Sequence, residues 1–121
     1  DYAHHLSRRA RGLPFWFSLA VHGTQAYADA VELTLDRARE AATMIDAHPH
    51  LELVTDQQLS ICVFRRLGWT PDDYKSWSSQ LLESGIALVT PTKHEGETVL
   101  GFCVVNPRTS SDDIQQILES L

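Results

Sequence analysis

A short helix that is apolar on almost every side constrains this fold more than any other feature of the sequence. From Leu13 to His22 nearly every side chain is apolar or aromatic, and Pro14 stands where the first turn of a helix tolerates proline. Gly23 ends this helix, and Thr24 can cap the next one because its hydroxyl can accept from an unpaired backbone N–H. We therefore expect the first helix to be buried on several sides.

A second, longer helix is predicted from Gln25 to about Ala47. Its apolar or small residues recur every three or four positions, at Tyr27, Val31, Thr34, Ala38, Ala41 and Ile45. Small side chains such as Ala38 and Ala41 would let this helix lie close to its support. The pair His48-Pro49 ends it, because the residue before a proline disfavours the helical conformation.

The rest of the chain alternates β-rich runs with two capped helices. Strands are expected at Leu51–Val54, Leu59–Phe64, Ile86–Thr90 and Glu97–Val105. One helix follows Thr70-Pro71 and ends at Ser84-Gly85, and a last helix follows Ser110 or Ser111. We expect Arg65-Arg66 to leave the sheet and Pro91–Gly96 to form a polar turn.

This order of elements predicts the fold class. The connection between the first two strands is short and polar, which favours antiparallel pairing. We therefore predict an α+β fold, with a small four-stranded, mostly antiparallel sheet and helices on one face.

Composition excludes several functions. The 121 residues suit one domain, and the formal net charge of −6 argues against a nucleic-acid partner, because the main basic cluster is only Arg8, Arg9 and Arg11. No apolar run has the length of a membrane span, so we expect no membrane partner. Cys62 and Cys103 lie in apolar runs, which indicates packed thiols in a reducing compartment such as the cytoplasm.

The chain begins at Asp1, and its single methionine is Met44. We therefore expect it to be a processed product, a trimmed form or a fragment of a longer protein.

Histidines offer a weak case for a metal. His4-His5, His48 and His50 have no cysteine or carboxylate beside them at zinc-ligand spacing, so surface histidines are the simpler interpretation. His22 stands at the end of a helix, where a favourable contact with the helix dipole explains it better than catalysis. We predict no metal site.

The sequence gives equally little support for a catalytic nucleophile. Cys62 and Cys103 have apolar neighbours on both sides, so we expect them to be packed rather than reactive. The two lysines, Lys75 and Lys93, lie in polar settings typical of solvated side chains. The sequence has no Gly-rich phosphate loop and no nucleophile elbow. We therefore assign no catalytic and no cofactor-binding residue.

Several motifs together resemble one enzyme family. They are Asp1-Tyr2, Ser7–Arg9, Phe15–Phe17, Leu51–Val54, Leu59–Arg65 and Leu100–Thr109, in this order. They resemble the C-terminal domain of the group II pyridoxal-phosphate-dependent decarboxylases, which include the aromatic amino acid, glutamate and diaminobutyrate decarboxylases. The resemblance covers nearly the whole chain.

The resemblance implies a fragment of a larger enzyme. Residues 1–23 would link to a large domain that precedes them, and residues 24–121 would form the small domain of a fold-type I enzyme. The cofactor, pyridoxal phosphate, would be held mainly by that large domain, which carries the family's lysine, aspartate and stacking histidine. The partners implied are the large domain and a second copy in a homodimer. This chain alone would not decarboxylate an amino acid.

Two positions bear on that interpretation. Where this sequence has Gly101 the family usually has an arginine, which in glutamate decarboxylases is implicated in holding the substrate carboxylate. Glycine cannot replace a bidentate guanidinium, so no catalytic role passes to Gly101. Arg8 matches a family arginine, and the resemblance gives it a structural or domain-contact role.

A second hypothesis is a free-standing α+β module that dimerises or holds a small ligand without catalysis. Fold alone does not decide between the two, because one fold carries many functions.

Overall fold

The computed structural model describes residues 10–121. The chain divides into two compact units, Asp1–Ala30 and Val31–Leu121. The sequence features at Asp1-Tyr2, His4-His5 and Ser7–Arg9 lie outside the described residues.

Helix α1 runs from Gly12 to Ala47 with one break. Gly23 has φ 79° and ψ 164°, a backbone conformation that only glycine adopts without strain. The two predicted helices are therefore confirmed, and they divide at the predicted glycine. In the first unit the Phe15 and Tyr27 rings meet edge to face with centroids 5.8 Å apart, and the Ser18 hydroxyl contacts that of Tyr27.

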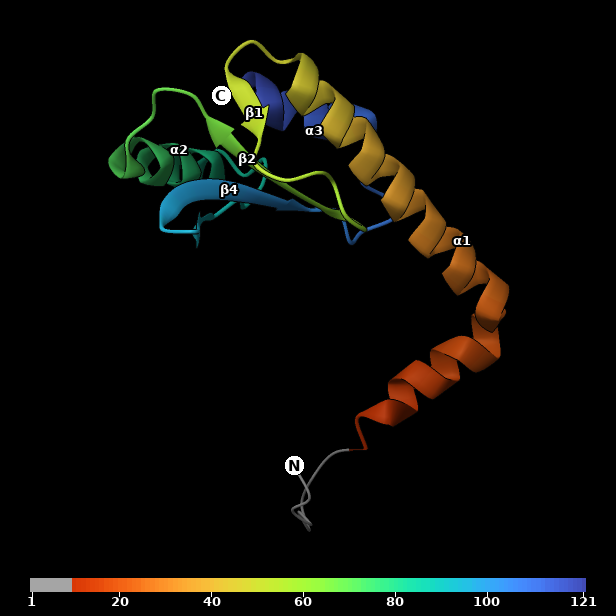
Figure 1. Cartoon of the computed structure of the whole chain (residues 1–121). Coiled ribbons are helices and arrows are strands. Elements are labelled where there is room, and N and C mark those ends of the chain that lie inside the picture. Colours follow the sequence, from red (N-terminus) through yellow and green to blue (C-terminus); the bar gives the residue numbers. More distant parts are fainter. Residues whose placement is uncertain (1–9) are drawn as a thin grey trace. The chain divides into compact units, whose positions relative to one another are not determined.

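The second unit contains one antiparallel sheet in the order β1-β2-β4-β3 (Figure 1). Its strands are β1 (Leu51–Leu53), β2 (Ile61–Arg66), β3 (Pro91–His94) and β4 (Glu97–Cys103). In the central pair, Cys62 lies opposite Phe102 and Phe64 lies opposite Leu100. These four side chains share one face of the sheet, because side chains alternate along a strand.

Helices cover that face. Residues of α1, α2 (Pro71–Glu83) and α3 (Ser111–Glu119) join the four central side chains in one hydrophobic core. The helix residues in this core are Ala38, Ala41 and Ile45 of α1, Tyr74, Trp77 and Leu81 of α2, and Ile114, Ile117 and Leu118 of α3. The predicted α+β fold with helices on one face is therefore confirmed.

Small side chains bring α1 close to the sheet. Ala38 and Ala41 are fully buried, and the Cys62 thiol donates to the Ala38 carbonyl oxygen at 3.4 Å. On the preceding residue of α1, the Arg37 Nε donates to the Thr109 carbonyl at 3.2 Å. These contacts tie α1 to β2 and to the segment before α3.

Capping boxes begin both shorter helices. The Thr70 and Ser110 hydroxyls accept from the backbone N–H groups of Asp73 and Asp113, and each carboxylate accepts from the N–H of its capping residue. These backbone bonds lower the pKa of both carboxyls. The predicted helix starts are confirmed.

The third strand was predicted in the wrong place. Residues 86–90 form no strand, and β3 is the segment Pro91–His94 that we expected to be a turn. The turn consists of Glu95 and Gly96, with φ 49° and 83°, and two residues with positive φ make a tight hairpin turn that pairs His94 with Glu97. Proline and lysine are tolerated in β3 because it is an edge strand.

The second strand begins and ends two residues later than predicted. Leu59 has φ 51° and lies in the turn before β2, where it is largely exposed. Arg65 and Arg66 do not leave the sheet, since they pair with Glu52 and Leu51 of β1. Their charge suggested a loop, but their side chains alternate between the two faces like those of any strand.

Replacing Thr70 by Ala should lower the free energy of unfolding by about 1 kcal/mol, because an N–H in the first turn of α2 loses its partner. Ser76→Ala is the matched control, since Ser76 is exposed in the interior of the same helix. That control should change the free energy by less than about 0.5 kcal/mol. Urea unfolding followed by circular dichroism measures both, and an equal loss in the two variants would contradict the capping role.

Candidate functional site

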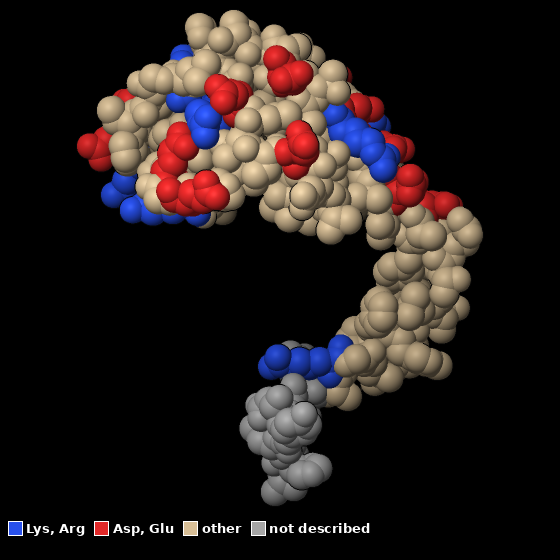
Figure 2. All heavy atoms as spheres, in the orientation of Figure 1, with Lys and Arg blue, Asp and Glu red and all other residues tan. Residues whose placement is uncertain are grey.

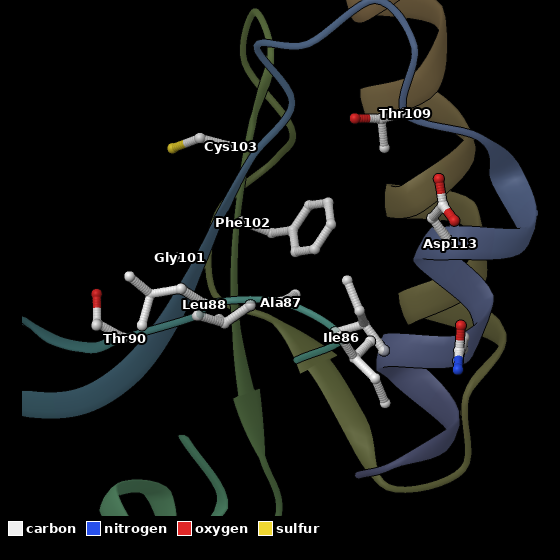
Figure 3. A pocket seen from close by; sticks show the side chains of 12 residues that line it. Ile86, Ala87, Leu88, Thr90, Gly101, Phe102, Cys103, Thr109 and Asp113 are labelled. Atoms are coloured by element: carbon white, nitrogen blue, oxygen red, sulfur yellow. The ribbon is translucent and has the colours of Figure 1, made fainter. Parts of the chain in front are cut away.

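The larger cavity of the second unit has a volume of about 570 Å³. It lies between residues 86–90, the end of β4 and α3 (Figure 3). The Phe102 ring points towards α3, and the Cys103 sulfur points to the opposite side of the strand (Figure 3). The gap exists because β3 pairs with β4 only as far as Leu100.

Few side chains in the lining of this cavity are charged or polar. It has apolar side chains, two threonines and Gln116, and its one charged residue is Asp113. That carboxylate is already bound to the Ser110 N–H at 2.9 Å in the capping box of α3. The cavity therefore offers no cation that could hold a carboxylate or a phosphate.

Gly101 lines the same cavity and lies opposite Val63 on β2. A Cβ placed on Gly101 would meet no atom within 4 Å, and its backbone does not have the positive φ that favours glycine. Nothing in the second unit therefore requires glycine at this position, and the space beside it is open. With no side chain, Gly101 contributes no functional group.

The two cysteines lie on opposite faces of the sheet. Cys62 is fully buried and burial raises the pKa of its thiol to about 11, so it stays protonated at neutral pH. Cys103 is exposed, contrary to the expectation that it is packed. Both thiols are free, and their opposite orientations keep them from pairing.

The histidine pair after α1 is a turn feature. The rings of His48 and His50 lie 5.8 Å apart, and the His50 N–H donates to His48 Nδ1 at 3.1 Å. Burial, and then the charge of His50 and Arg66, lowers the pKa of His48. Across residues 10–121 no group of three or more His, Cys, Asp or Glu side chains could hold a metal ion. His22 is exposed next to Gly23.

The second cavity, of about 400 Å³, lies at the other end of the sheet. Basic residues line it, among them Arg65, Arg66 and Lys93. Arg65 binds Glu97 through Nη2 at 2.9 Å and Glu52 through Nη1 at 2.9 Å. Our sequence reasoning missed this cavity because it placed Arg65-Arg66 outside the sheet, although their place at the end of an alternating β-rich run was a usable signal.

Apolar side chains are exposed in both units. In α1, Leu13, Phe15, Trp16, Phe17 and Val21 are all more than half exposed, with Val21 at 75%. Residues 12–28 contain no charged side chain, and Figure 2 shows this stretch as uncharged surface. In the second unit, Ile61 and Cys103 lie on the face of the sheet opposite the helices, and Leu59, Leu88 and Val105 are also exposed. Both surfaces are suited to being covered by another protein surface.

No helix between residues 10 and 121 combines the length and the apolar character needed to cross a bilayer.

Comparison with known proteins gives a consistent result. No family model matches the chain. It is 28% identical over 123 residues to an aromatic-L-amino-acid decarboxylase of Bacillus atrophaeus, covering 93% of this chain and 25% of that protein. It is also 26% identical over 110 residues to a histidine decarboxylase of Rattus norvegicus, covering 90% of this chain and 16% of that protein.

A solved structure supports the same relationship. The glutamate decarboxylase domain of a diaminobutyrate-pyruvate transaminase and L-2,4-diaminobutyrate decarboxylase from Vibrio parahaemolyticus matches with a TM-score of 0.80 and 27% identity. The match covers 94% of this chain and 25% of that one. The chain thus spans about a quarter of the length, or less, of these relatives.

Replacing Gly101 by Ala should raise the free energy of unfolding by about 0.5 kcal/mol, because glycine weakens the interior of a strand and the new Cβ meets open space. Gly96→Ala is the contrasting variant: at φ 83° it should lower the free energy by about 1 kcal/mol. Chemical denaturation measures both. If Gly101→Ala were as damaging as Gly96→Ala, the absence of a side chain at position 101 would be a structural requirement.

Proposed function

The chain is homologous to the C-terminal portion of the group II pyridoxal-phosphate-dependent decarboxylases, and from this we propose that it is the C-terminal domain of an amino acid decarboxylase. The observation that carries the proposal is the coverage: nearly all of this chain aligns with these enzymes, yet it spans about a quarter of their length or less. The whole enzyme would remove the α-carboxylate of an amino acid.

The larger cavity does not fit pyridoxal phosphate. The cofactor needs a lysine for its Schiff base, and Lys75 and Lys93 are both exposed side chains. The larger cavity has neither a lysine nor a cation for the phosphate group. We therefore propose that the preceding domain holds the cofactor. No catalytic step is assigned to a residue of this chain.

The role proposed for this chain is to cover and support that domain. Phe15 and Trp16 of α1 and Ile61 of the sheet have exposed apolar side chains. Burying them against another protein surface would be favourable, because it removes apolar area from water. The large domain of the same enzyme is the partner we propose for these surfaces, and a second copy of the enzyme completes a homodimer. In this arrangement residues 1–23 link the two domains and residues 24–121 form the small domain. The helix break at Gly23 lies at that boundary, whereas the compact units divide further along α1, between Ala30 and Val31.

The enzyme is proposed to act in the cytoplasm, where a buried free thiol such as Cys62 and an exposed one such as Cys103 stay reduced. A stand-alone binding module is the second candidate. The closed core of the second unit and its cavity of about 570 Å³ favour it, since both belong to this chain alone.

Recombination of the two parts separates the candidates. The chain with added pyridoxal phosphate should show no lysine-dependent absorbance band and no release of carbon dioxide from amino acids. Mixed or co-expressed with the preceding domain, it should form a stoichiometric complex, visible by size-exclusion chromatography with light scattering, and decarboxylase activity should appear.

A control variant tests the proposed surface. Trp16→Glu places a charge on the exposed aromatic helix and should weaken complex formation, because a buried charge is costly. Arg39→Glu, on the exposed charged face of α1, should leave the complex intact. A monodisperse chain that never associates with the preceding domain would favour the stand-alone module.

A further inference from the structure

A second feature of the sheet has no part in the proposed decarboxylase role. The cavity of about 400 Å³ is lined by the end of β2, the loop that follows it, the first turn of α2 and the β3–β4 hairpin. Its size is within the range of small-molecule sites. Four residues decide its character: Arg66, Lys93, Thr98 and Trp69.

The Arg66 side chain is held in a fixed position. Its Nε donates to the main-chain oxygen of Leu121 at 2.8 Å, and its Nη1 donates to that of Leu67 at 2.7 Å. Its guanidinium carbon lies 5.3 Å from the centre of the Trp69 ring. A guanidinium has five N–H donors, so donors remain beyond these two bonds. Little side-chain entropy is left to lose when such a group binds a ligand.

Arg66 and Lys93 share a second property, which is that no side-chain carboxylate pairs with them. In the described part of the chain the salt bridges involve Arg37, Arg39 and Arg65, whereas Arg66 and Lys93 take part in none. Arg65 lies in the same lining, but it binds the carboxylates of Glu52 and Glu97, and Glu97 lines the cavity too. The lining therefore contains three cations and one carboxylate, and Arg66 and Lys93 are the two cations that no side-chain carboxylate pairs with in the described residues.

From this arrangement we infer that the cavity is a binding site for a small oxyanion, either a phosphate group or a carboxylate. Arg66 supplies a preorganised guanidinium, and Lys93 supplies a mobile ammonium from the neighbouring hairpin. Thr98 adds a hydroxyl that can donate to an oxygen. The larger cavity lacks these groups, so the two cavities differ in the ligands they can hold. This inference is independent of the decarboxylase proposal.

The chain offers a well-matched test because it has two lysines. Inorganic phosphate and succinate are titrated separately into the full chain, with sodium chloride at equal ionic strength as the salt control. Nuclear magnetic resonance shifts of the Gly96 and Thr98 backbone N–H groups report binding. Lys93→Gln removes the proposed ligand group, Lys93→Arg restores the charge, and Lys75→Gln removes the other lysine, which is exposed on α2 and does not line the cavity.

At least one of the two anions should give saturable shifts confined to the cavity, with a dissociation constant of about 1–10 mM, as expected for a few exposed charges. Lys93→Gln should weaken this binding about fivefold and Lys93→Arg should restore it, whereas Lys75→Gln should change it by less than about twofold. Saturation by phosphate alone or by succinate alone identifies the ligand class within the inference. Shifts that follow ionic strength only, or equal effects of Lys93→Gln and Lys75→Gln, would overturn it.

Discussion

Burial of one face of the sheet is the interaction on which the rest of this structure depends. Cys62, Phe64 and Leu100 are completely buried there, and Phe102 nearly so, under helices that come from three separate stretches of sequence. Removing a large side chain such as Phe64 from a packed core typically costs about 3–5 kcal/mol, which is a large part of the stability of a domain of this size. α1 can contribute because Ala38 and Ala41 let it lie close to the strands.

Some apolar side chains lie outside this core, on the opposite face of the sheet and in the first unit. Ile61 is 44% exposed there, and the aromatic side chains of α1 are exposed in the first unit. The charges on that face are confined to the network of Arg65 with Glu52 and Glu97, which crosses three strands. Exposed apolar side chains of this kind are suited to being covered by another protein surface.

Much of the fold could be predicted from the sequence because local chemistry decided it. The capping residues Thr70 and Ser110 are each followed, three residues later, by the aspartate that completes the capping box. Gly23 breaks α1 because it adopts a non-helical backbone conformation. β3 could not be placed in this way. Its position depends on a turn with positive φ at Glu95, while the more β-like segment before it is held by the Ser78 hydroxyl, which donates to the Val89 carbonyl at 2.5 Å. The candidate site was harder still, since both cavities are formed by segments that meet only after folding.

Hydrogen exchange measured amide by amide tests the central claim most directly: the second unit forms a complete core, whereas the apolar helix before Gly23 needs a partner. In the isolated monomeric chain, amides of β2 and β4 should be strongly protected, and those of residues 13–22 should exchange within seconds, as expected for an unsupported helix of this length. Joined to the large domain that we propose as its partner, residues 13–22 should gain protection comparable to that of the sheet. Strong protection of residues 13–22 in the isolated monomer, or fast exchange throughout β2 and β4, would contradict the account.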